Sequence, residues 1–166
     1  MSKQQKAKTG AASAAAEAMQ LDHEEFVTMT IDNQWFGIPV HRVQDVLGTQ
    51  NIARIPLAPP DVAGSLNLRG RIVTAIDPRV RLGMSARGAD EAAMSIVVEQ
   101  GGELYSLLID QVGEVLNLPA NRFEQNPASL DGRWREISAG VYRLDDRLLV
   151  VMDVDRLLEF DKDVAA

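Results

Sequence analysis

Cysteine is absent from the 166-residue chain. Its absence excludes disulfides, thiolate nucleophiles and thiolate metal sites together. No apolar run approaches the roughly 18 residues that a membrane helix requires, and the N-terminus lacks the short apolar core of a secretory signal peptide. The composition therefore predicts a cytoplasmic protein without direct membrane insertion, built as one domain or as two small units that share a core.

Positive charge is also scarce. The net charge is −7, and the chain from Glu17 onward carries −10, because Lys3, Lys6 and Lys8 supply +3 ahead of the first acidic residue. A body this acidic is a poor match for a phosphate backbone, which rewards clustered Lys and Arg. We therefore expect no nucleic-acid partner.

Motifs that carry catalysis are missing as well. The phosphate-binding loop, the dinucleotide fingerprint and the Gly-x-Ser-x-Gly nucleophile elbow do not occur. The histidines are only two, His23 and His41, and no nucleophile accompanies them. Four carboxylates (Asp145, Asp146, Asp153 and Asp155) fall at a hairpin turn and at a helix start, where Asp is favoured for structural reasons. We expect no catalytic residue, no metal site, no cofactor and no enzyme activity, with a site assembled from distant loops as the remaining alternative.

An internal repeat organises the rest of the chain. The first 22 residues are rich in Ala, Ser, Lys and Gln and predict a disordered tail ahead of a single domain spanning 23–162. Within that domain, Phe36–Leu47 matches Tyr105–Leu116 at a constant offset of 69 residues, and Ala63–Asp77 matches Ala139–Asp153 at an offset of 76. The second copy therefore has seven extra residues in its internal connection.

Each copy has the pattern of hairpin, longer excursion, second hairpin and short helix. The copies span roughly 26–82 and 95–158, with Met84–Ala93 as a linker. A unit of this size with four or five short strands cannot bury both faces of an open sheet, so we expect each to close into a small β-barrel. The two barrels pack together, and strands are free to cross between the copies. Asp77 and Asp153 are expected to cap helices over Pro78–Leu82 and Val154–Phe160.

A motif in the first copy resembles a known family. Arg54-Ile55-Pro56-Leu57-Ala58-Pro59 is followed by Gly64, by Asn67-Leu68-Arg69-Gly70, and by a strand that ends in Ile76-Asp77. This order is similar to that of the bacterial chemotaxis coupling protein CheW, and the likeness covers residues 25–160. Asp45 stands where the family commonly has glutamate, and Thr74-Ala75 stands where proline is frequent.

The resemblance implies a mainly β fold of two packed, five-stranded SH3-like barrels with short helices. It also implies a non-enzymatic adaptor with two partners, the regulatory domain of the histidine kinase CheA and the cytoplasmic tip of methyl-accepting chemoreceptors. Other CheW copies in rings are a further implied partner. Such a protein is cytoplasmic and is recruited to the inner face of the membrane through receptor arrays.

The same segment provides candidate binding residues. Alternation in a strand places Leu66 and Leu68 on one face and Asn67 and Arg69 on the other, and Gly70 supplies the positive φ of a tight turn. From the residues alone, Arg69 is better explained as an ordinary solvated turn arginine. The resemblance implies a receptor-binding role for it, and correspondence with the family implies that Val43, Asp45, Val46, Gly64 and Arg69 line or support a receptor-binding groove. Asn67, on the same outer face as Arg69, completes the predicted receptor-binding residues.

Three points stay open from the sequence. Core packing is the alternative role for Val43 and Val46 and stays open for Val46, and the kinase-binding residues are unknown. The alternative functions are a CheW-like adaptor of a non-chemotaxis receptor–kinase pathway, such as surface motility or development, and a small-barrel nucleic-acid-binding protein.

Overall fold

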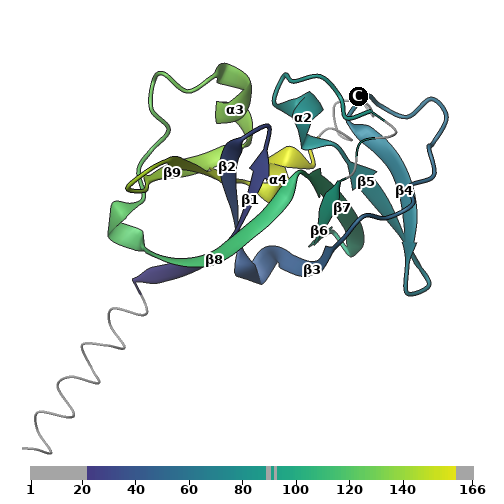
Figure 1. Ribbon diagram of the computed structural model, residues 1–166, viewed down its shortest axis with the longest axis horizontal. Helices are drawn as coiled ribbons and strands as arrows, with labels where there is room; N and C mark the ends of the chain where they lie inside the picture. Colours follow the sequence, from purple (N-terminus) through teal and green to yellow (C-terminus); the bar gives the residue numbers. More distant parts are fainter. Residues whose placement is uncertain (1–21, 89–90, 92, 160–166) are drawn as a thin grey trace, which may run out of the picture.

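Two five-stranded β-sheets lie side by side (Figure 1). This computed structural model describes residues 22–88, 91 and 93–159. In spatial order, sheet A contains β8 (Gln111–Pro119), β1 (His23–Ile31), β2 (Gln34–Pro39), β10 (Leu148–Met152) and β9 (Ser138–Arg143). Sheet B contains β3 (Val43–Leu47), β6 (Met94–Gln100), β7 (Glu103–Ile109), β5 (Arg71–Ile76) and β4 (Val62–Leu68).

The expected mainly β fold with two five-stranded units is confirmed. The short helices are η1 (Val40–Arg42), α2 (Pro78–Arg81), η2 (Ala120–Arg122), α3 (Gly132–Ile137) and α4 (Val154–Leu157). Strand β1 begins at His23, three residues earlier than the first strand signal in the sequence. The expected tail falls almost wholly on residues 1–21, which lie outside the described part, as do Phe160 and the last residues of the predicted domain.

The sheets do not coincide with the two sequence copies. Sheet B is one continuous segment, 43–109, whereas sheet A combines the N-terminal hairpin, 23–39, with three strands from 111–152. The two sheets have equivalent strand orders. In order, β3, β6, β7, β5 and β4 of sheet B correspond to β8, β1, β2, β10 and β9 of sheet A. The repeat is thus a pseudo-two-fold relation in which each sheet takes its hairpin from one copy and three strands from the other.

Most of the inner strands are buried on both faces. In β2, Phe36 and Ile38 enter the large core between the sheets, while Trp35 faces a smaller core inside sheet A. In β7, Leu107 lies in the large core and Leu108 in a second small core inside sheet B. Two-faced burial explains why these strands have continuous apolar runs instead of alternating patterns.

Aspartates cap the helices that follow β5 and β10, as expected. Asp77 accepts a hydrogen bond from Arg79 N at 3.1 Å, and Asp153 accepts one from Arg156 N at 3.2 Å. The helices are shorter than predicted, since α2 ends at Arg81 and α4 at Leu157. A third helix, α3, was not predicted. It occupies the longer connection of the second copy and is capped by Asp131.

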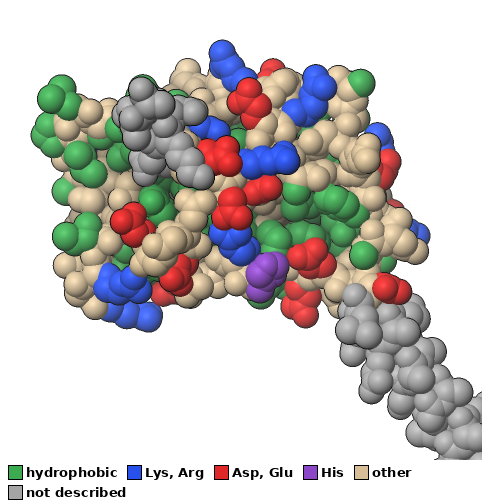
Figure 2. Space-filling view, turned by 180° about the vertical axis from the view of Figure 1, so that it is seen from behind, with side chains coloured by type: hydrophobic (Ala, Val, Ile, Leu, Met, Phe, Trp, Pro, Cys, Tyr) green, Lys and Arg blue, Asp and Glu red, His purple; other side chains and the backbone are tan. Residues whose placement is uncertain are grey.

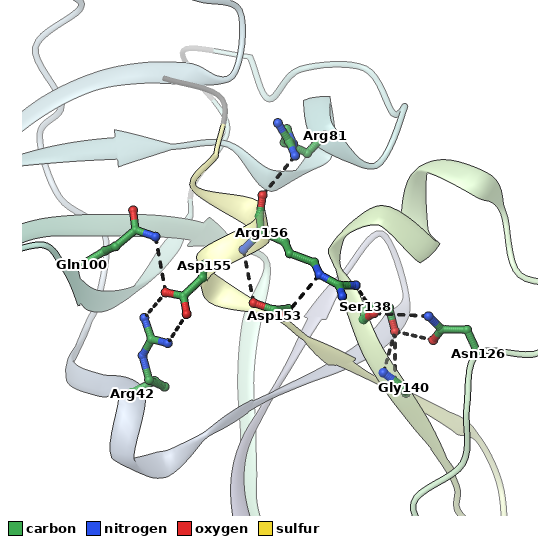
Figure 3. A network of polar contacts seen from close by, with 9 residues as sticks. All are labelled: Arg42, Arg81, Gln100, Asn126, Ser138, Gly140, Asp153, Asp155 and Arg156. Atoms are coloured by element: carbon green, nitrogen blue, oxygen red, sulfur yellow. Dashed lines mark hydrogen bonds and ion pairs between the residues drawn. The ribbon is translucent and has the colours of Figure 1, made fainter. Parts of the chain in front are cut away.

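An ion pair fixes each of the two places where the chain passes from one sheet to the other. At the β2–β3 crossing, Arg42 makes two contacts with Asp155 of α4, at 2.8 and 3.1 Å (Figure 3). That hydrogen bonding outweighs desolvation and raises the pKa of Arg42. At the β7–β8 crossing, Asp110 accepts from Arg79 of α2 at 2.9 Å and also contacts Arg87.

One residue of each ion pair corresponds by the repeat to one residue of the other pair, with the charge reversed. Arg79 and Asp155 are equivalent at the offset of 76, yet the first is the cation of its pair and the second is the anion. Burial works to raise the pKa of Asp110, but the hydrogen bonds from Arg87 and from Asp32 N, together with the nearby cationic charge, lower it below its ordinary value. Each half of the fold therefore has its own pairing at the crossing.

Candidate partner-binding site

Arg69 occupies the tip of the β4–β5 hairpin. Its φ is +51° and that of Gly70 is +84°, so both central residues of the turn have the left-handed values of a type I′ turn. The side-chain oxygen of Asn67 accepts a hydrogen bond from Gly70 N at 2.9 Å. The glycine behaves as the sequence predicts, and Asn67 has a structural role in closing the turn.

The identity of the residue at the tip is unusual for this turn. Two other hairpins make the same two-residue turn with Asp32-Asn33 and with Gly101-Gly102, which are residues that tolerate positive φ. A long side chain in this conformation costs roughly 1–2 kcal/mol. Strain of this kind often lies where a side chain is needed for function, so the conformation of Arg69 is itself a reason to look for a partner.

The guanidinium of Arg69 reaches the edge strand β3. Its Nη2 atom lies 3.4 Å from Oδ2 of Asp45, and the two side chains are 83% and 29% exposed. Asp45 Oδ1 also accepts a hydrogen bond from Val46 N at 2.9 Å. The structure therefore brings together two predicted site residues that are 24 positions apart in the sequence, and it leaves most of the arginine accessible.

The two valines of the predicted site have different environments. Val43 packs against the large core between the sheets, whereas Val46 is 40% exposed. The register of β3 shifts between Val43 and Asp45, where a bulge interrupts the pairing with β6. Core packing was the alternative that stayed open for Val46, but the structure shows the reverse, since Val43 is the valine that packs against the core. Val46 is exposed apolar surface on the edge strand, and strand alternation turns its side chain to the opposite face of β3 from Asp45.

Gly64 is buried and holds the backbone in place. Its φ is +153°, and a Cβ atom built there would collide with the carbonyl oxygen of Ala53 and come within 2.8 Å of Ile52. Gly140, its equivalent at the offset of 76, has a φ of +156° and the same kind of collision, with Phe123 and at 2.6 Å with the carbonyl oxygen of Glu124. Because both copies need this glycine, Gly64 supports the site through the scaffold and offers no contact surface of its own.

Ile72 extends the surface and was missed in the sequence. It is directly opposite Asn67 in the β4–β5 ladder, so the two side chains share a face, and Ile72 is 79% exposed. The signal was available, since the alternation that turns Leu66 and Val73 inward also turns Ile72 outward. The hairpin and the edge strand thus present an arginine paired with a carboxylate, with Ile72 as exposed apolar surface on the same hairpin.

The candidate site is an open surface on sheet B. The described part of the chain has hollows of about 680 and 280 Å³, and neither of these is lined by Val43, Asp45, Val46, Asn67 or Arg69. Within the described residues, no group of three or more His, Asp or Glu side chains could hold a metal ion. The helices of that same part are all too short to span a membrane. Such a surface can bind a macromolecule through the hydrogen-bond donors of the Arg69 guanidinium and through adjacent apolar area.

The fold and this surface define a two-sheet β protein whose chemistry suits binding to another protein. Comparison with known proteins gives the family. The CheW-like domain family matches residues 25–162, which is most of the chain. The chain therefore belongs to the CheW-like domain family.

Relatives with established names are chemotaxis proteins. The chain is 31% identical over 139 residues to the chemotaxis protein CheW of Klebsiella aerogenes, covering 84% of each chain. It is 29% identical over 137 residues to CheW of Thermotoga maritima, covering 81% of this chain and 87% of the relative. The crystal structure of the scaffolding protein TtCheW from Thermoanaerobacter tengcongensis matches with a TM-score of 0.73 at 27% identity, over 83% of this chain and 89% of that one.

Proposed function

We propose that this protein is a non-enzymatic adaptor that couples methyl-accepting chemoreceptors to the histidine kinase CheA in chemotaxis signalling arrays. Its family and the names of its relatives support the pathway. The observation that carries the proposal is Arg69, a long side chain held at a positive φ at an exposed tip and joined to Asp45. Through these arrays the protein is recruited to the inner face of the membrane.

The chemistry around Arg69 suits a receptor helix. A helix that docks on a surface needs apolar contact along one stripe and a polar contact that fixes its register. Val46 and Ile72 are exposed at 40% and 79% and supply apolar area. Arg69 can donate to a helix carboxylate, while Asp45 holds the guanidinium at one end. Asn67 and Gly64 act indirectly. Asn67 closes the turn, and Gly64 allows the close packing of the backbone that supports it.

Reconstitution of receptor, kinase and adaptor tests the proposal. With wild-type protein, receptor-dependent CheA autophosphorylation is expected, and Arg69→Glu is expected to remove it while leaving the fold intact, because the side chain is 83% exposed. The repeat supplies a matched control. Asp145 is the equivalent of Arg69 in the β9–β10 turn and is also exposed, so Asp145→Lys reverses a tip charge on the other sheet and should retain activation. Activation by Arg69→Glu at the wild-type level would contradict the proposal.

A further inference from the structure

The connection between β3 and β4 contains a second residue in a strained conformation. Ile55 O accepts a hydrogen bond from Ala58 N at 3.3 Å, which closes a turn with Pro56 and Leu57 at its centre. The φ of Leu57 is +62°. A turn with proline at its second position and a positive φ at its third is a type II turn, where glycine or asparagine is the favoured third residue. Leucine at this position has a steric cost and no compensation within the turn.

The side chain of Leu57 also gains nothing from burial. It is 104% exposed, and its neighbour Ile55 is 42% exposed. Figure 2 shows hydrophobic side chains gathered at the upper left of the molecule, the end at which Figure 1 places the β3–β4 connection. Removing a leucine side chain from water stabilises a complex. The folded monomer obtains none of that from Leu57, while it bears the strain of presenting it.

The surroundings of Leu57 make it a rigid, positively charged tip. Pro56, Pro59 and Pro60 restrict the backbone on both sides, so little conformational freedom is lost when the tip binds. Arg54 is exposed and takes part in no ion pair found among the described residues. No carboxylate occurs between Thr49 and Pro60, which gives this stretch a positive charge on a chain whose net charge is −7.

We propose that Leu57, with Ile55 and Arg54, forms a docking tip that inserts into an apolar pocket edged by carboxylates on a globular protein partner. A single protruding leucine on a stiff turn is convex, so it fits a pocket better than the convex face of a helix. The surface around Arg69 is separate from this tip and is the one assigned to the receptor. The inference rests on the proposed function, because it assigns the tip to the second, globular partner of the adaptor.

The positive φ of Leu57 allows the binding role of the tip to be tested separately from its effect on stability. Leu57→Asn and Leu57→Gly place favoured residues at a positive φ, so both variants should melt at the wild-type temperature or a few degrees above it. Both should bind the purified CheA regulatory domain at least about tenfold more weakly than wild type, which is the effect of removing an interface anchor. Binding to a receptor cytoplasmic fragment should stay at the wild-type level. Leu57→Met, which keeps an apolar side chain of similar volume, is the control and should retain most of the binding.

Three outcomes would overturn the inference, and each is distinct from a failure of the proposed function. Unchanged binding of Leu57→Asn to the kinase domain removes the tip from that interface. Loss of receptor binding instead of kinase binding assigns the tip to a helix. A melting temperature lowered by Leu57→Asn indicates that the leucine turns inward and fills the adjacent hollow of about 680 Å³, which Ile55 and Leu57 border. If wild-type protein bound neither the kinase domain nor the receptor fragment, the proposed function itself would fail.

Discussion

Arg69 at the tip of the β4–β5 hairpin lies 3.4 Å from Asp45 on the edge strand β3. The contact joins the two outermost strands of sheet B, because β3 and β4 stand at opposite ends of its strand order. It also gives the arginine a defined direction while most of the side chain stays in water. The pair is therefore better suited to positioning a binding group than to stabilising the fold.

Asp45→Asn tests this division of roles. An ion pair with one strongly exposed partner contributes about 0–1 kcal/mol, so the free energy of unfolding in a urea titration should change by less than about 1 kcal/mol. Receptor-dependent kinase activation should fall, because Arg69 is no longer oriented. A large loss of stability with activation unchanged would reverse the assignment and make the pair structural.

The equivalent glycines Gly64 and Gly140 should behave alike. Alanine at either position combines a positive φ with a collision against backbone or an aromatic ring, so each substitution should lower the free energy of unfolding by about 2 kcal/mol or more. Gly102 is the matched control. Its φ is +80° but a Cβ atom would meet nothing within 4 Å, so Gly102→Ala should cost only about 1–2 kcal/mol. Equal losses for all three would show that crowding adds nothing.

The two crossings use ion pairs of opposite orientation, so we expect that exchanging the two charged residues at one crossing preserves part of the stability. Arg42→Asp alone places two carboxylates together and should destabilise the protein by about 1–2 kcal/mol. Arg42→Asp combined with Asp155→Arg should recover part of that loss in a double-mutant cycle. The measurement is chemical denaturation of both single variants and the double variant. Strict additivity would mean that the contact drawn in Figure 3 contributes nothing to stability.

Asp110 predicts a dependence of stability on pH. Its pKa is lowered in the folded state from an ordinary value of 3.8, so the folded protein favours the ionised carboxylate. The resulting stabilisation is present above pH 3.8 and is lost as the pH falls through the folded-state pKa. Asp110→Asn should therefore be less stable than wild type at neutral pH, and the difference should shrink in strong acid. Unfolding free energies that differ equally at both pH values would contradict the role of ionisation.

Much of the fold was predictable from the sequence, because hairpin turns and helix caps are local signals. The repeat was visible for the same reason, since equivalent elements keep equivalent residues such as Asp77 and Asp153. What the repeat could not predict was the pairing of β2 with β10 and of β7 with β5 across the copies. Both alternatives bury the same side chains, so local patterns do not distinguish a barrel made from one copy from a barrel made by exchange.

The site was predictable in part for a comparable reason. The alternation of β4 predicted an exposed Asn67, and Gly70 predicted the turn, whereas Arg69 lies in the turn itself, beyond the end of β4. The proximity of Asp45 depends on how β3 meets the hairpin tip, and the opposite environments of Val43 and Val46 depend on a bulge. The positive φ of Arg69 and Leu57 contradicts the ordinary preference of those residues, so it could be learned only from the structure.

Receptor-dependent kinase activation by Arg69→Asn tests the central claim most directly. The substitution creates Asn-Gly, the pair that a type I′ turn favours, and should raise the free energy of unfolding by about 1 kcal/mol. Asp145→Asn at the equivalent tip of sheet A is the control and should activate normally. We predict a more stable protein that fails to activate the kinase. Arg69→Asn protein that is more stable and activates at the wild-type level would contradict the claim that Arg69 is held in its strained conformation to bind a partner.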